Sequence, residues 1–270
     1  MLKAVWRLAA LTTLIAIFSS IGGILLLVLG QTPRHKVIST RFVGWLCVLG
    51  IKVLGIRPKW ISKSGVGRPK FVVSNHLSYI DVLVLAARIP LAFVTSVEIR
   101  ESFPLGYWCR IGGCLFVERR NRRQIPEEVA SIKDLFLHGV GVCVFPEATS
   151  TNGDFVRPFK KSLFAAAVDS QTTIQPIALR YLRADERPID ETSRDSIFWY
   201  GDMGFASHLW RLVNLNSIEV EVNLLDEVPV EGRQCRKQLA ELSHQKISRC
   251  YMSTPPILPA LNVPASMLTA

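Results

Sequence analysis

The sequence predicts an α/β fold: a mixed sheet flanked by helices and preceded by an N-terminal helical region that anchors the chain in a membrane. Beyond Pro69, short apolar runs alternate with helix-like stretches, as in a sheet with helices on its faces. Before this point, two long apolar stretches occupy the first 60 residues. The length of 270 residues suits one large domain together with an anchor.

The first apolar stretch, residues 8–29, has no charged residue over 22 positions, which is enough to cross a hydrocarbon core of about 30 Å. The second, residues 42–54, is interrupted only by Lys52 and contains Trp45, a residue suited to the membrane interface. We expect a retained anchor, because a cleaved signal peptide has a shorter apolar run of about 7–15 residues. Basic residues flank both stretches, so a true span and a re-entrant hairpin remain equally open.

The charge distribution agrees with a membrane anchor. Residues 1–70 contain eleven Lys or Arg and no acid, so the other 200 residues contain 32 − 11 = 21 bases against 22 acids. Basic segments attract polyanions, which makes nucleic acid and anionic lipid candidate partners. The flanking apolar stretches favour lipid, and the neutral part of the chain shows no bases interleaved with aromatics that would indicate nucleic-acid binding.

The remaining elements follow in order along the chain. We expect short apolar strands at residues 71–74, 91–95, 114–118, 140–145, 174–181 and 218–225. We expect helices between or after them at residues 79–88, 127–138, 161–169, 206–213 and 234–251. The predicted domains are therefore an anchor at 1–60, an α/β domain at 61–253, and an extended or disordered tail at 254–270 that contains four prolines.

Polar residues follow three of the predicted strands, at the edge where ligands collect in open α/β sheets. They are His76, Arg119 and Glu147. The motif Asn75-His76-x-x-x-x-Asp81 places an imidazole in the loop and a carboxylate in the first turn of the next helix. Such a carboxylate can accept from one ring nitrogen and leave the other free as a base near neutral pH. A structural His–Asp pair is the alternative.

Three further motifs accompany this pair. A strand with Gly113 and Phe116 ends at Arg119, which could fork onto a phosphate or a carboxylate. The run Pro146-Glu147-Ala148-Thr149 opens a turn rich in hydroxyls and backbone donors, which can bind a polar headgroup or be an ordinary capped turn. Pro176 lies inside a predicted strand, which indicates a sheet edge or a bulge.

In this order, the four motifs resemble the four blocks of the glycerolipid acyltransferase family that contains bacterial 1-acyl-glycerol-3-phosphate acyltransferases. The family blocks read N-H-x4-D, G-x-x-F-V-x-R, F-P-E-G-T and a short apolar block around a proline. The first two match fully, and Ala148 replaces the usual glycine of the third. The resemblance covers residues 65–182. An alanine at this position means that the backbone does not need glycine-only angles or that the turn has shifted.

The resemblance implies a role for each matched residue. His76 would act as general base on the acceptor hydroxyl, and Asp81 would orient it. Asn75, Gly113, Phe116 and Arg119 would belong to the substrate site, together with Pro146, Glu147, Ala148 and Thr149 around the acceptor head and Pro176 on the acyl-donor side. The lipid hydroxyl would attack an acyl thioester directly, so the resemblance implies acyl carrier protein or coenzyme A as co-substrate carrier and no other cofactor. The chain contains no G-x-S-x-G elbow for a covalent acyl-enzyme.

The expected function is therefore transfer of a fatty acyl group to a lysophospholipid such as 1-acyl-glycerol-3-phosphate, at the cell membrane with the catalytic domain on the cytosolic face. Later stretches, around Trp199 and Trp210, resemble the lyso-ornithine lipid acyltransferase branch, which makes that lipid the alternative acceptor. A membrane-tethered hydrolase or binding module is the alternative of another class.

Six scattered cysteines without C-x-x-C spacing favour neither a metal site nor a disulfide framework.

Overall fold

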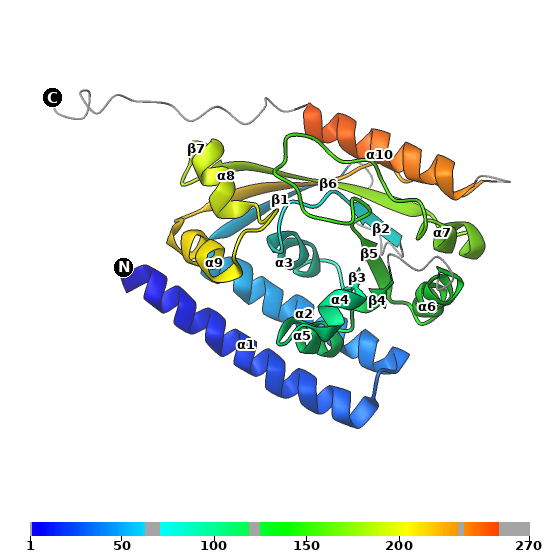
Figure 1. Cartoon of the computed structure of the whole chain (residues 1–270), viewed down its shortest axis with the longest axis horizontal. Helices are drawn as coiled ribbons and strands as arrows, with labels where there is room; N and C mark the ends of the chain where they lie inside the picture. The colour runs from blue at the N-terminus through cyan, green and yellow to red at the C-terminus, as the bar shows by residue number, and fades with distance from the viewer. Residues whose placement is uncertain (1, 63–70, 119–124, 232–234, 254–270) are drawn as a thin grey trace.

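The computed structural model describes residues 2–62, 71–118, 125–231 and 235–253 (Figure 1). Its centre is a mixed sheet in the order β1-β8-β6-β2-β5-β3-β4, with β7 paired to β6. The strands pair in parallel except where β6 meets β8 and β7. The strands are β1 (Ile56–Ser62), β2 (Phe71–Ser74), β3 (Leu91–Ser96), β4 (Leu115–Val117), β5 (Gly141–Val144), β6 (Ile174–Ala184), β7 (Arg187–Pro188) and β8 (Ile218–Leu224). The predicted mixed α/β sheet is confirmed.

The helices of the described chain fall into the N-terminal pair and those around the sheet (Figure 1). They are α1 (Leu2–Leu29), α2 (Pro33–Leu54), α3 (Ile80–Ala86), α4 (Val97–Glu101), α5 (Leu105–Ile111), α6 (Ile125–Leu137), α7 (Ala165–Ser170), α8 (Glu191–Ile197), α9 (Phe205–Asn214) and α10 (Arg236–Met252). Each predicted strand and helix corresponds to one of these elements within a few residues. The sequence did not predict β1, β7, α4, α5 or α8. The predicted tail at 254–270 lies outside the described residues.

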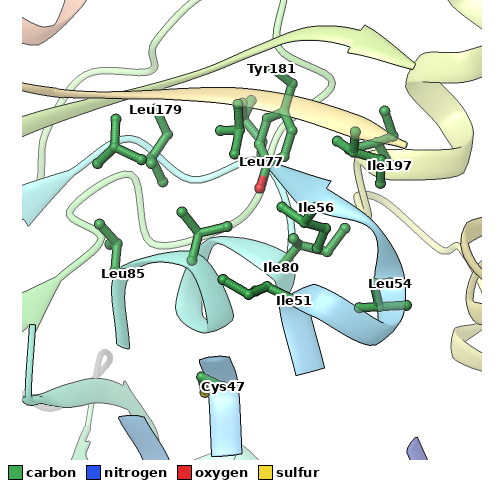
Figure 2. Close-up of a cluster of buried hydrophobic side chains, with 14 of the residues drawn as sticks. Cys47, Ile51, Leu54, Ile56, Leu77, Ile80, Leu85, Leu179, Tyr181 and Ile197 are labelled. Atoms are coloured by element: carbon green, nitrogen blue, oxygen red, sulfur yellow. The ribbon is translucent and has the colours of Figure 1, made fainter. Parts of the chain in front are cut away.

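The two faces of the sheet bury two separate hydrophobic clusters, because side chains alternate along each strand. On β2, Val72 belongs to one cluster, and Phe71 and Val73 belong to the other. The first cluster lies under α2, α3 and α9, and the second lies under α6, α7 and α10 (Figure 1). Figure 2 shows the first cluster, where Tyr181 projects from β6 with its hydroxyl between the sheet and α3.

The N-terminal helices α1 and α2 form an antiparallel pair along one side of the molecule (Figure 1). Both are long and apolar enough to cross a membrane by length and composition. A left-handed Gly30 ends α1, and Thr32 caps α2 by accepting from the backbone N–H of His35. The outer face of α1 is strongly exposed; Leu27, for example, is 88% exposed. Such a face is the part of the chain that could anchor it in a membrane.

The start and the middle of α1 are fastened to the domain. Near its start, the Arg7 guanidinium donates to the carbonyl oxygens of Val213, Leu215 and Asn216, just where α9 ends. Near its middle, Ser19 accepts from Tyr107 and Trp108 of α5, at 2.8 and 3.1 Å. The adjacent Gly22 and Gly23 allow this approach, since an added Cβ would lie 3.0 Å from Ile111 or 2.5 Å from the Tyr107 hydroxyl. The glycine pair thus serves helix packing.

The structure corrects one sequence prediction, and in another it excludes a sheet edge and favours the alternative of a bulge. The range predicted for the anchor, 1–60, contains most of β1, which pairs in parallel with β8 and is part of the sheet. Pro176 does not lie at a sheet edge, because β6 has β8 on one side and β2 on the other. The pairing with β8 is irregular beside the proline: Ile177 pairs with Leu224, whereas Ile174 bridges to Val228. This irregularity accommodates a residue without a backbone N–H.

Candidate active site

The loop between β2 and α3 holds a His–Asp pair. The Nδ1 atom of His76 lies 2.9 Å from Oδ2 of Asp81. The same oxygen accepts the backbone N–H groups of Leu77 and Ser78 at 2.7 and 2.9 Å, so the aspartate also caps the turn that leads into α3. Asp81 is completely buried, while the His76 side chain is 21% exposed. Part of the imidazole is therefore accessible to solvent, while its Nδ1 side is held by a buried carboxylate.

The orientation of the His76 ring is fixed by packing as well as by the carboxylate. The ring stacks on Phe145, with centroids 4.1 Å apart and planes 16° from parallel. Phe145 follows β5, the strand next to β2, and itself stacks on Phe93 of β3. Because Nδ1 faces Asp81, Nε2 is the ring nitrogen that remains for a substrate. An imidazole in this state can accept a proton from a hydroxyl.

Asn75 precedes this histidine and faces inward. It is 1% exposed, its amide nitrogen donates to the carbonyl of Leu179 at 3.0 Å, and its amide oxygen accepts the Leu179 N–H at 2.8 Å. The side chain thus adds two hydrogen bonds between the end of β2 and the backbone of β6. A direct substrate contact for Asn75, implied by the resemblance, is not available in this geometry; the residue supports the loop instead.

Glu147 also faces inward. Its two carboxylate oxygens accept the backbone N–H groups of His76 and Arg157, at 2.7 and 2.8 Å, and the residue is only 4% exposed. Burial raises the pKa of Glu147 to about 7, although these two N–H groups and nearby His76 act in the opposite direction. The implied contact between Glu147 and the acceptor head is therefore corrected: the carboxylate holds His76 and the 157 loop together.

The turn after Glu147 forms part of a cleft. Ala148 has a φ of 64°, so it adopts the left-handed conformation although it stands where the family has glycine. Thr149 is exposed, and its hydroxyl donates to the carbonyl of Ser150. Pro146 is buried and its carbonyl accepts the Lys160 N–H at 2.8 Å, which brings a basic segment against the turn. The turn therefore has the left-handed backbone conformation that a glycine adopts readily at this position.

The cleft has a volume of about 550 Å³ and opens beside the Phe145 ring that supports His76. Pro146 and Ala148 line it, together with the cations Lys160, Lys161 and Arg236 and the acids Glu118 and Glu128. Arg236 opens α10, almost ninety residues after the third motif, and was not among the site residues predicted from the sequence. Its position in the first turn of a predicted helix was the signal that the sequence offered.

The other predicted site residues take different positions. Gly113 has a φ of 78° in the turn between α5 and β4, where an added Cβ would lie 3.4 Å from the Lys36 backbone. Phe116 lies on the edge strand β4 and is partly buried. Arg119 lies just outside the described residues, one position after Glu118 of the cleft. Pro176 is buried inside the sheet, and its implied place on the acyl-donor side stays a prediction.

An aromatic group packs on the outer side of the His76 loop. Its centre is Tyr79, whose ring lies 5.8 Å from Trp199 and 5.3 Å from both Phe205 and His208. The Tyr79 hydroxyl also pairs with Nδ1 of His208 at 3.0 Å, and burial lowers the pKa of His208 to about 4. This neutral histidine is a packing partner. The stretch around Trp199 therefore contacts the motif loop directly.

A mixed sheet whose central strands carry a His–carboxylate pair beside a cationic cleft defines an α/β protein equipped for proton transfer on a charged or polar substrate. The family model described as Acyltransferase matches residues 57–180. The lyso-ornithine lipid O-acyltransferase of Rhodobacter capsulatus is 32% identical over 206 residues, covering 72% of this chain and 70% of the relative. The 1-acyl-sn-glycerol-3-phosphate acyltransferase of Neisseria meningitidis is 30% identical, covering 66% and 71%.

The chain belongs to the acyltransferase family that contains these lysolipid acyltransferases, and it is an acyltransferase. The fold agrees: the crystal structure of the 1-acyl-sn-glycerophosphate acyltransferase PlsC from Thermotoga maritima superposes with a TM-score of 0.63 at 17% identity, covering 93% of this chain and 94% of that one. The resemblance expected from the sequence is confirmed. Membership of this family disfavours the alternatives of a hydrolase and a binding module.

Proposed function

We propose that this protein is a membrane-bound O-acyltransferase that transfers a fatty acyl group from an acyl thioester to the free hydroxyl of a lysolipid. The observation that carries the proposal is the His76–Asp81 contact of 2.9 Å, with the carboxylate fully buried and the imidazole partly exposed beside a cleft. General-base catalysis of this kind contributes roughly 10²–10⁴-fold in rate.

In the proposed reaction, Nε2 of His76 takes the proton of the lysolipid hydroxyl as its oxygen attacks the thioester carbonyl carbon. Asp81 stabilises the imidazolium that forms, through the contact at Nδ1. The tetrahedral intermediate then releases the thiolate, which receives the proton from His76, so the histidine returns to its neutral state. A thiolate is a good leaving group, so the enzyme needs no covalent acyl intermediate.

For the substrates, we propose that Lys160, Lys161 and Arg236 hold an anionic part of the acceptor head or of the donor in the cleft that they line. Arg119, which follows the cleft residue Glu118 in the chain, is proposed to join them. The acyl donor is a thioester of acyl carrier protein or of coenzyme A. No other cofactor is proposed.

For the acceptor, 1-acyl-glycerol-3-phosphate remains the first proposal and lyso-ornithine lipid the second. Relatives named for each acceptor are about equally similar to this chain, at 30% and 32% identity. The acidic residues Glu118 and Glu128 among the cations of the cleft favour a test of the second acceptor, whose head carries an amine. Supplying the purified protein with each acceptor and a labelled acyl donor separates the two; no transfer to either contradicts both.

The base assignment has its own experiment. In lipid vesicles, the His76→Ala variant is expected to lose roughly 10³-fold or more of the acyl-transfer rate, and Asp81→Asn a similar order of magnitude. Vesicle flotation should show unchanged membrane binding. His138→Ala is the matched control, since His138 forms a surface pair with Asp134 at 3.4 Å. Retention of acyl transfer by a folded His76→Ala protein would refute the proposed base.

A further inference from the structure

A fourth hydrogen bond reaches the buried aspartate from a distant strand. The hydroxyl of Tyr181, on β6, donates to Oδ1 of Asp81 at 2.7 Å. The other carboxylate oxygen, Oδ2, already serves His76 and the two backbone N–H groups of the loop. The two carboxylate oxygens therefore have different partners: Oδ2 contacts the histidine, and Oδ1 accepts from the tyrosine.

The tyrosine is confined to the role of donor. Burial raises the pKa of Tyr181 well above its ordinary value, and the adjacent Asp81 charge raises it further, so the phenol keeps its proton. Its ring is locked in the first core cluster (Figure 2). It packs edge-on against Phe198, with centroids 5.5 Å apart. A rigid donor with a fixed proton fixes the plane of the carboxylate.

We propose that Tyr181 is a positioning residue for the His76–Asp81 pair: its hydroxyl orients the Asp81 carboxylate and limits how strongly that carboxylate attracts the proton on His76. The proposal rests on the function proposed above, because it acts through the base that His76 supplies. Tyr181 lies 100 positions after Asp81 and five after Pro176, outside the four motifs. It reaches the pair because β6 is the direct neighbour of β2.

Removal of the hydroxyl has a predictable sign. Without this donor, the negative charge of Asp81 is less delocalised and less solvated, so both the carboxylate and the paired imidazole hold protons more tightly. The acid limb of the pH–rate profile then moves to higher pH. Other titratable groups facing the pair are Tyr79, Cys143 of β5, Glu147 and Tyr251 of α10. These groups are the same in the parent protein and in the Tyr181 variant, so they do not produce a difference between the two pH–rate profiles.

The test compares Tyr181→Phe with Tyr200→Phe. Tyr200 also donates to a carboxylate, Oδ1 of Asp195, at the same 2.7 Å, but outside the site. In vesicles with a lysolipid acceptor, we expect Tyr181→Phe to lower kcat by about tenfold, with KM within about twofold, and to move the acid limb up by about half a pH unit or more. Tyr200→Phe should change none of these. A folded Tyr181→Phe protein with the parent kcat and acid limb overturns the proposal.

A double-mutant cycle distinguishes positioning from general packing. If Tyr181 acts through Asp81, Tyr181→Phe should have little further effect on kcat in an Asp81→Asn background, whereas independent effects would multiply and overturn the proposal. If Asp81→Asn alone leaves kcat unchanged, the proposed His–Asp function fails and not merely this inference. Should Tyr181→Phe not fold, 3-fluorotyrosine at position 181 keeps the ring and strengthens the donor. The acid limb should then move to lower pH, and an unmoved limb overturns the proposal.

Discussion

Ala148 holds a backbone conformation that glycine adopts more readily. At a φ of 64°, its Cβ crowds the backbone, at a cost of about 1 kcal/mol or more. Replacing it with glycine removes this strain but adds chain entropy to the unfolded state. We expect Ala148→Gly to raise the free energy of unfolding by about 0.5–1 kcal/mol, measured by denaturant titration in detergent.

The matched control for this substitution is Ala166→Gly in α7, where the backbone is helical and the side chain is buried. That change should lower the free energy of unfolding by about 1 kcal/mol or more. If Ala148→Gly destabilises the protein as Ala166→Gly does, the left-handed turn at position 148 is not strained.

Glu147 gives the protein a pH-dependent stability. Its pKa is raised by burial from the ordinary 4.5 to about 7, so the folded protein binds this proton more tightly than the unfolded chain does. Its contribution to the free energy of unfolding is greatest below about pH 4.5, falls as the pH rises to about 7, and is constant above that. The total change is at most about 3 kcal/mol.

The Glu147→Gln variant isolates this contribution because its amide does not titrate. We expect the difference in unfolding free energy, parent minus variant, to decrease between about pH 4.5 and 7 in denaturant titrations. A difference that rises with pH over this range would mean that the N–H groups of His76 and Arg157 outweigh burial. At all pH values the variant should be a slower enzyme, since its amide N–H₂ opposes one of those two N–H donors.

Among the elements, α1 and α9 are joined by one buried cation. Arg7 of α1 donates to three carbonyl groups at and after the end of α9, including Val213 at 3.1 Å and Asn216 at 3.2 Å. These carbonyls end a helix and lack partners within it, so the guanidinium caps α9 from outside. Because α9 also carries His208 against Tyr79 of the motif loop, the anchor is mechanically connected to the candidate active site.

The Arg7→Met variant tests the strength of this connection. It keeps the apolar stem but removes the donors, so we expect a loss of about 2–3 kcal/mol in the free energy of unfolding and faster proteolysis between α9 and β8. Lys3→Met is the control, since Lys3 makes one exposed hydrogen bond to the Asn216 side chain, and it should cost under about 1 kcal/mol. Equal losses in both variants would contradict the capping role of Arg7.

The regular elements were predictable because their patterns are local. The four buried residues of β2 and the alternating β8 have such patterns, and their predicted bounds agree with the structure to within one residue. In contrast, β1 contains Arg57, Pro58 and Lys59, and only its pairing with β8 makes it a strand. The seven-residue helix α5 is apolar because it packs on α1, a contact that no local pattern reveals.

At the scale of the whole molecule, the anchor and the domain form one body. Contacts at Arg7 and Ser19 hold the start and the middle of α1 against the domain, while its opposite face is exposed and apolar. A helix held in this way cannot cross the bilayer without carrying the domain with it. This geometry favours the re-entrant hairpin over the true span.

A protease-protection assay tests this topology. With tags at the N-terminus and at the C-terminus, we expect protease to remove both from the same side of sealed vesicles. In a hairpin, the start of α1 and the end of α2 lie on the same side of the membrane as the domain. Tags with opposite accessibility would contradict the hairpin. Replacing the exposed Leu27 by lysine should weaken vesicle binding.

The sequence by itself determined the two apolar N-terminal stretches, most of the strands and helices in their order along the chain, and the pairing of His76 with Asp81, because each depends on residues a few positions apart. Only the tertiary structure decided what surrounds that pair. Since β2 lies between β5 and β6, residues that follow or belong to those strands converge on its loop: Glu147, Leu179 and Tyr181. The same strand order turns Asn75 and Glu147 inward, away from the substrate roles implied by their motifs. Contacts between residues about 70 to 100 positions apart depend on which strands become neighbours, and no local spacing encodes that choice.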